Sequence, residues 1–195
     1  PNIVAAVQAV LENSADALRL YPDPDATALK QAIAKQQNVD VENVFVGNGS
    51  DEVLAHIFKA FFVQEKPILY PDITYSFYPV YSQFFGIAEK TKILPLNDDF
   101  EIEVNDYKQP NGGIIITNPN APTSIALGLS AIEEVLQANP DSVVLIDEAY
   151  VDVGAESAVS LVEKYDNLVV CQTMSKSRSL AGLRVGFAIA QPHLI

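Results

Sequence analysis

The stretch Gly113-Ile114-Ile115-Ile116-Thr117 decides the fold of this chain. A continuous β-branched run of this kind is typical of a strand that is buried on both faces, as in a parallel sheet. Working outward along the chain, residues 143–146 and 168–171 are two more short apolar runs of the same character. These three runs predict the centre of a mainly parallel sheet.

Further elements flank these central strands. Additional strands are expected at residues 44–46, 67–70, 89–94 and 185–190. Helices are expected at residues 3–13, 26–37, 52–63, 75–85 and 130–138. Ser130 and Glu133 have the spacing of a capping box at the start of the last helix. Because strands alternate with helices nearly throughout, the sequence predicts a three-layer α/β/α fold with a mainly parallel central sheet.

Composition excludes several classes of partner. The net charge of −13, with only 12 basic residues and no run of them, argues against nucleic acid or an anionic membrane. No apolar run approaches the ~20 residues of a membrane span, and no signal-peptide pattern is visible. Cys171 is the only cysteine, which fits a reducing cytoplasm, our expected location. The distant His56 and His193 leave no expected metal site.

Polar residues follow several of the predicted strands, at the edge where ligands bind in such sheets. Gly49-Ser50-Asp51 lies between a strand and a helix. Backbone N–H groups at a helix start bind anions, and glycine allows a phosphate to approach closely. Taken alone, Ser50 or Asp51 is more often a simple helix cap.

Asp147 directly follows the strand at residues 143–146. A carboxylate at the end of a buried strand needs a cationic or hydrogen-bonding partner. The pyridinium N1–H of pyridoxal 5'-phosphate (PLP) would supply one, and the hydroxyl of Tyr150 would reach the phenolic oxygen of that cofactor. The alternative for Asp147 is a structural ion pair with a buried tyrosine.

The segment 173–184, TMSKSRSLAGLR, places Lys176 on a Ser-rich loop just past an apolar strand. In a buried setting, a lysine at a strand end is a nucleophile towards carbonyls, and Arg184 would hold a phosphate nearby. A plain surface lysine is the alternative. Tyr75 would either stack on the pyridine ring or pack in the core beside Phe77.

The order of these motifs, together with residues 118–123, resembles the fold type I PLP-dependent aminotransferases, and among them it is most similar to the histidinol-phosphate aminotransferases. The resemblance covers essentially the whole chain. It implies that Lys176 bonds to the cofactor aldehyde and that Asp147 pairs with N1.

The resemblance also implies roles for the other motif residues. Tyr150 would bind the phenolic oxygen of PLP, and Tyr75 would stack on its ring. Gly49, Ser50, Asp51, Ser175 and Arg184 would hold the phosphate. Tyr21 would reach the cofactor phosphate of the neighbouring subunit in a homodimer.

The chain departs from the family pattern in the loop after residue 117. The asparagine usual before Pro-Thr is Ala121, so Asn120 or Asn118 is expected to replace it through a loop shift. The glycine usual after Pro-Thr is Ser124, which costs little if the backbone there avoids positive φ. The resemblance further implies that residues 1–195 are the PLP-binding large domain alone, a fragment without the N-terminal arm and C-terminal small domain of the family, and inactive by itself.

The function implied is transfer of an amino group between L-glutamate and imidazole acetol phosphate, in histidine biosynthesis. The substrates would be small amino and keto acids. A threonine-phosphate decarboxylase and an aromatic or broad-specificity aminotransferase are the alternatives within the same fold. A non-catalytic PLP-binding or dimerisation domain is the alternative from another class.

Overall fold

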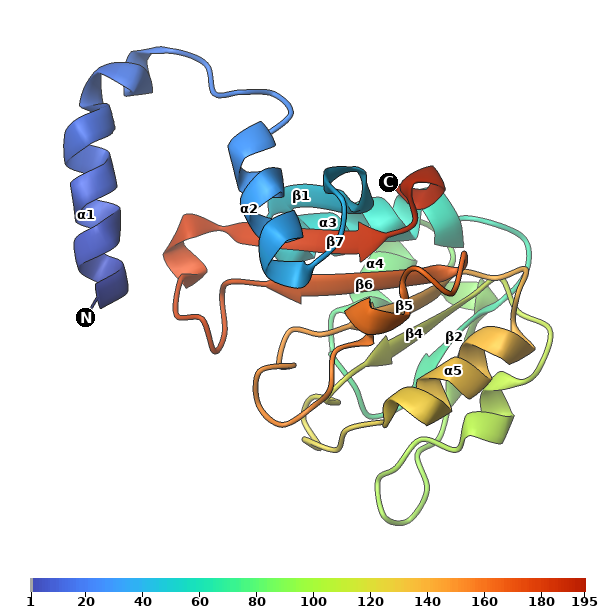
Figure 1. Ribbon diagram of the computed structural model, residues 1–195. Coiled ribbons are helices and arrows are strands. Elements are labelled where there is room, and N and C mark those ends of the chain that lie inside the picture. The colour runs from blue at the N-terminus through green and yellow to red at the C-terminus, as the bar shows by residue number, and fades with distance from the viewer. Residues whose placement is uncertain (1) are drawn as a thin grey trace.

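The computed structural model describes residues 2–195 and contains a seven-stranded sheet (Figure 1). The strand order is β1-β7-β6-β5-β4-β2-β3. The strands are β1 (Val44–Asn48), β2 (Ile68–Pro71), β3 (Thr91–Leu94), β4 (Gly113–Thr117), β5 (Val144–Asp147), β6 (Leu168–Thr173) and β7 (Val185–Ala190). The helices are α1 (Asn2–Ser14), α2 (Thr27–Gln37), α3 (Ser50–Ile57), α4 (Tyr78–Phe84) and α5 (Leu129–Ala138).

The sheet is mainly parallel, as predicted. Strands β3, β2, β4, β5 and β6 pair in parallel, whereas β7 is antiparallel to both of its neighbours, β6 and β1. The start of β7 therefore lies at the same edge of the sheet as the carboxyl ends of the other strands. Thr173 at the end of β6 faces Gly186, and Asn48 at the end of β1 faces Val185.

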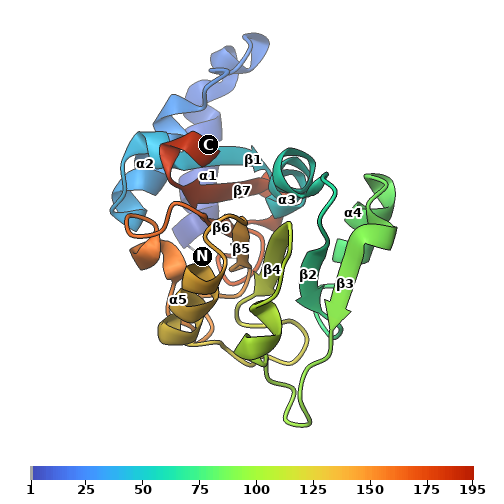
Figure 2. The same cartoon turned by 90° about the vertical axis from the view of Figure 1, so that its right-hand side faces the viewer.

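Helices cover both faces of the sheet, which gives the three predicted layers (Figure 2). Side chains alternate along each strand: Ile114 and Ile116 of β4 pack in one core cluster, and Ile115 packs in the other. The first cluster includes buried residues of α2 and α5, and the second includes those of α3 and α4. The runs that looked buried on both faces in the sequence are indeed the centre of the sheet.

Helix boundaries differ from the sequence predictions most clearly in α3 and α4. Helix α3 begins at Ser50 and continues as a π-helical turn over Phe58–Phe62. Helix α4 begins at Tyr78 rather than at Tyr75, because Pro79 has no backbone N–H and fits only the first turn.

The predicted capping box of α5 is wrong. The N-cap is Gly128, whose carbonyl accepts from the N–H groups of Ala131 and Ile132, and no side chain caps the helix. Ser130 therefore lies inside the first turn. The expectation for Ser124 also needs correction, since its φ is 62°, a left-handed conformation that costs a serine roughly 1 kcal/mol.

Helix α1 stands apart from the sheet at the end of a long connection (Figure 1). That connection includes Tyr21, whose side chain is fully exposed. Val10 and Leu11 of α1 are also largely exposed. Within residues 2–195, none of the helices combines the length and the apolar character needed to cross a bilayer.

Candidate active site

A cavity of about 240 Å³ opens at the edge of the sheet where β4, β5 and β6 end and α3 begins. Eight of the eleven residues predicted for the site line it. These are Ser50, Asp51, Tyr75, Asp147, Tyr150, Ser175, Lys176 and Arg184. The sequence thus identified most of the lining, and the predicted convergence of the strand-end motifs on one crevice is confirmed.

Asp147 forms the floor of this cavity at the end of β5, where it is 3% exposed. The Tyr78 hydroxyl donates to its Oδ2 at 2.7 Å, and the backbone N–H of Ala149 donates to Oδ1 at 3.2 Å. Burial of the carboxylate raises the pKa of Asp147 to about 6 despite these bonds. The buried tyrosine partner of the alternative interpretation exists, but it is a hydrogen-bond donor and the carboxylate still faces the cavity.

Lys176 and Tyr150 lie at the mouth of the same cavity. The Lys176 Nζ is 5.5 Å from the centroid of the Tyr150 ring. The buried setting expected for Lys176 is wrong, because its side chain is exposed on the loop that extends past the end of β6. Lys176 and Asp147 nevertheless share one cavity, which is the arrangement that the predicted chemistry requires.

The opposite end of the cavity gathers anion-binding groups. Helix α3 starts at Ser50, so the backbone N–H groups of its first turn have no partner within the helix. Arg184 lies beside them, with Nη2 3.3 Å from Asp51 Oδ2 and Nη1 3.5 Å from Ser175 Oγ. The N-cap of α3 is Gly49 and no side chain caps it, so the simple-cap interpretation of Ser50 and Asp51 is wrong.

Two glycines make this end of the cavity tight. Gly49 has φ of 81°, and a Cβ placed there would lie 2.3 Å from Arg184 Nη2. A Cβ on Gly186 would lie 2.2 Å from the backbone N of Ser50. Both glycines are therefore needed for β7 and Arg184 to pack against the start of α3.

Tyr75 crosses the cavity from the segment before α4. Its hydroxyl donates to Asp51 Oδ1 at 3.2 Å, and burial together with this carboxylate raises the pKa of Tyr75 to about 12. Tyr75 also packs edge-on against Tyr78, with 5.4 Å between the ring centroids. Its ring is thus both part of the aromatic cluster and part of the cavity wall.

The donor set fits PLP. A guanidinium, a hydroxyl and a helix start can hold a phosphate; a buried carboxylate that is short of cationic partners can hold a protonated ring nitrogen; a lysine can bond to the aldehyde. The Asp51 carboxylate is the one group at the anion end that opposes a phosphate, and its contact with Arg184 is long enough to be exchanged for one.

Four predicted residues do not line the cavity: Gly49, described above, and Asn120, its alternative Asn118, and Tyr21. Asn120 donates its amide N–H to the carbonyl of Ile73 at 2.8 Å and does not line the cavity, whereas Ala121 does. Asn118 is bonded through both amide atoms to the backbone of Leu127. The structure thus gives no support to either asparagine as a replacement at position 121. Tyr21 is fully exposed and is not among the residues that line the cavity of its own chain.

Sequence reasoning missed two residues of the site. Tyr78 holds Asp147, and Thr117 lines the cavity with its Oγ1 2.7 Å from the Tyr78 hydroxyl. Thr117 carried a usable signal, since it is the last residue of the central strand and faces Asp147 in the register. Tyr78 carried none that separated it from the other aromatic residues around it.

The fold and this cavity define an α/β protein of the PLP-dependent transferase type. The chain belongs to the class I and II aminotransferase family, whose sequence profile matches residues 2–195. Members of this family depend on PLP.

Curated relatives and solved structures agree with this assignment. The chain is 82% identical over all 195 residues to a histidinol-phosphate aminotransferase of Acinetobacter baumannii (strain SDF), and it covers 54% of that protein. It thus spans about half the length of the curated relatives it matches.

Two solved structures share the fold at lower identity. Histidinol-phosphate aminotransferase from Sinorhizobium meliloti, solved in complex with pyridoxal-5'-phosphate, has a TM-score of 0.78 at 23% identity, with 96% of this chain and 53% of that chain covered. L-threonine-O-3-phosphate decarboxylase from Porphyromonas gingivalis has a TM-score of 0.81 at 23% identity, with 97% and 57% covered.

Proposed function

We propose that the full-length protein is a PLP-dependent aminotransferase that transfers an amino group between L-glutamate and imidazole acetol phosphate in histidine biosynthesis. The single observation that carries the chemistry is the cavity that Lys176, Asp147 and Tyr150 share with the anion-binding start of α3. The sequence identity of 82% to a histidinol-phosphate aminotransferase supports the choice of substrate. Residues 1–195 would then be the PLP-binding large domain.

Each residue has a role that its position supports. Ser175, Arg184 and the N–H groups at the start of α3 bind the cofactor phosphate. Asp147 keeps the ring nitrogen protonated, and Tyr150 donates its hydroxyl to the phenolic oxygen. When bound, PLP supplies an aldehyde that captures amines and a ring that accepts an electron pair from the substrate Cα.

Lys176 performs the proton transfer. Its amine, on an exposed and adjustable side chain at the cavity mouth, would take the proton from the substrate Cα and hold it on Nζ. Tyr75 forms part of the cavity wall, and its hydroxyl stays protonated at neutral pH because its pKa is about 12.

The covalent role of Lys176 is tested by trapping. Full-length protein is incubated with PLP, reduced with borohydride, digested, and the labelled peptide is sequenced. We expect the label on Lys176 and its loss in Lys176→Ala, while Lys164→Ala, on another surface, keeps the label. A label on any other lysine contradicts the assignment.

The substrate is tested with competing keto acids. Full-length protein is given L-glutamate with imidazole acetol phosphate or with an aromatic keto acid, and 2-oxoglutarate is measured. We expect the phosphate substrate to be preferred. Release of carbon dioxide from threonine phosphate would instead favour the decarboxylase, whose fold the chain shares.

The proposal includes a cytoplasmic homodimer in which Tyr21 reaches the neighbouring site. The full exposure of Tyr21 and the apolar residues exposed on α1 support a partner for this part of the chain. Cys171 is a buried free thiol, as suits a reducing compartment.

A further inference from the structure

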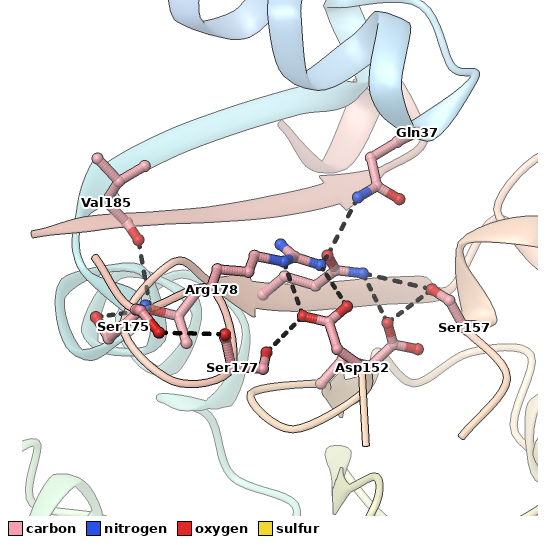
Figure 3. Close-up of polar contacts among 11 residues, drawn as sticks. Gln37, Asp152, Ser157, Ser175, Ser177, Arg178 and Val185 are labelled. Atoms are coloured by element: carbon pink, nitrogen blue, oxygen red, sulfur yellow. Dashed lines mark hydrogen bonds and ion pairs between the residues drawn. The ribbon is translucent and has the colours of Figure 1, made fainter. Parts of the chain in front are cut away.

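Directly beside Lys176, the side chains of the next two residues contact a single carboxylate (Figure 3). Arg178 donates to Asp152 twice, from Nε to Oδ2 at 2.9 Å and from Nη2 to Oδ1 at 3.1 Å. The Ser177 hydroxyl donates to Asp152 Oδ2 at 2.5 Å. The Arg178 and Ser177 bonds lower the pKa of Asp152, so this carboxylate stays ionised at neutral pH.

The same arginine is anchored to the interior of the protein. Its Nη2 also donates to Gln172 Oε1 at 2.9 Å, and Gln172 Nε2 donates to Glu148 Oε2 at 2.8 Å. Gln172 and Glu148 are each 1% exposed. Glu148 accepts in turn from the Ser157 hydroxyl at 2.7 Å and from the backbone N–H of Ala158. A fully bonded buried group of this kind is a rigid point of attachment.

The residues of this network lie one or two positions along the chain from the three predicted catalytic residues. Ser177 follows Lys176, Asp152 lies two residues after Tyr150, and Glu148 follows Asp147. Arg178 and Asp152 are not among the residues that line the cavity, so they act on it only through their neighbours. Arg178 is also held from the sheet side, with its guanidinium 5.9 Å from the Phe187 ring.

We propose that Arg178 and Asp152 are positioning residues that fix the Lys176 loop against the turn carrying Tyr150. Their ion pair sets the distance between the lysine amine and the tyrosine hydroxyl. Gln172 connects this pair to the buried Glu148, which follows the end of β5. The inference rests on the proposed function, since it assigns a purpose to this pair in that chemistry.

The physical need for such a device follows from the exposure of Lys176. Its loop leaves the sheet at the end of β6 and returns at Val185, and its local backbone bonds include those from Ser179 to the Lys176 carbonyl and from Leu180 to the Met174 carbonyl. These bonds shape the loop but do not connect it to the segment after β5. A displacement of about 1 Å at a reacting group is enough to cost on the order of a hundredfold in rate.

The test uses full-length, PLP-loaded protein with Arg178→Ala, Asp152→Ala and the double variant. Lys164→Ala is the matched control, because it removes a surface ion pair with Glu133 elsewhere on the chain. The readouts are kcat and KM with L-glutamate, the pH midpoint of the absorbance of the lysine-bound cofactor, hydrogen exchange of residues 174–184, and thermal unfolding.

We expect each single variant to lose roughly tenfold in kcat with KM changed much less, because positioning rather than binding is lost. The pH midpoint of the lysine-bound cofactor shifts, and exchange of the loop speeds up. The double variant is no worse than either single variant, since both remove the same pair. Arg178→Lys restores part of the rate, and the control matches the wild type.

Two results overturn the positioning role. Wild-type kcat and pH midpoint in Arg178→Ala would show that the pair does not place Lys176. Loss of stability alone, with the absorbance titration unchanged, would show that the pair is merely structural. If the wild type forms no bond between PLP and Lys176, the proposed function itself fails. The role of the Arg178–Asp152 pair is then judged by loop exchange in the cofactor-free protein, and exchange in Arg178→Ala equal to that of the wild type overturns it.

Discussion

At the scale of single residues, Asp147 is the group whose environment is most at odds with its charge. It is almost fully buried, and its partners are a tyrosine hydroxyl and one backbone N–H. Burial, with no cation bonded to it among the described residues, makes the carboxylate less stable in the folded chain than in water, so its pKa rises from 3.8 to about 6 although the charge of Lys176 lowers it. A bound pyridinium N–H would supply that missing cation.

This predicts a pH-dependent cost for the cofactor-free protein. The folded pKa of Asp147 lies above its unfolded value, so its contribution is favourable below about pH 4 and is lost as pH rises through about 6. Asp147→Asn should therefore stabilise cofactor-free, full-length protein at pH 7 by up to about 3 kcal/mol. Chemical denaturation from pH 4 to 8 measures the difference.

The comparison between the two proteins contains its own control. At pH 4 the aspartic acid is mostly protonated, and the variant and the wild type should be nearly equal in stability. At pH 7 the variant should have lost the PLP-dependent reaction even though it is more stable. A constant stability difference across this pH range would contradict the raised pKa.

Residue types were readable from the sequence where a strand end gave them context. Asp147, Lys176 and Arg184 each stand next to an apolar run, and all three line the cavity. Tyr78 and Asp152 were not identified, because their importance depends on contacts across 69 and 26 positions of the chain, to Asp147 and Arg178. No local pattern records a contact of that kind.

At the scale of elements, the reversed strand β7 builds the anion end of the cavity. Its antiparallel direction brings Arg184 and Gly186 to the edge where the other strands finish. Gly186 then lies directly against the start of α3. The strand itself was predicted, but its direction was not, because an apolar run reads the same in either direction.

Gly186→Ala should damage both the fold and the anion site. The added Cβ would meet backbone atoms of Gly49 and Ser50 at 2.2 Å, and backbone cannot give way as a flexible side chain can. We expect a loss of stability on the order of 3 kcal/mol, and PLP binding weakened beyond that of an equally destabilised protein. Thermal unfolding and PLP titration measure the two effects.

Gly182→Ala is the matched control for this prediction. No described atom lies within 4 Å of the Cβ it would add, and it lies four residues before Gly186, in the turn Ala181–Leu183 that precedes β7. Its stability should stay within about 0.5 kcal/mol of the wild type. Equal behaviour of the two variants would contradict the close approach of β7 to α3.

At the scale of the whole molecule, the N-terminal segment is placed as if it had a partner. Helix α1 stands away from the sheet, and Tyr21 on the connection to α2 is fully exposed (Figure 1). A tyrosine that completes the site of a neighbouring subunit has no reason to pack on its own chain. This interpretation makes a prediction that activity in mixed dimers can test.

Mixing Tyr21→Ala protein with Lys176→Ala protein should restore activity. If Tyr21 acts across the interface, a mixed dimer contains one site with an intact lysine from one subunit and an intact tyrosine from the other. We expect activity well above that of either variant alone, approaching half of the wild type for each mixed dimer. The proteins are unfolded together, refolded as a mixture and assayed.

The same experiment excludes the alternative. If Tyr21 served its own chain, every site in the mixed dimer would lack one residue, and no activity would return. A mixture of Lys176→Ala with Asp147→Asn is the control. Both residues line the cavity of the same chain, so each site in this mixed dimer lacks one of them and no activity should return.

The sequence by itself determined the α/β class, the central strands and the residues at their ends, because apolar periodicity and strand-end position are local properties. Tertiary structure alone decided the direction of β7, the partners of Asp147 and the ion pair between Arg178 and Asp152. These depend on which distant segments become neighbours, and that is fixed only when the helices of both layers pack on the sheet and bury its two faces.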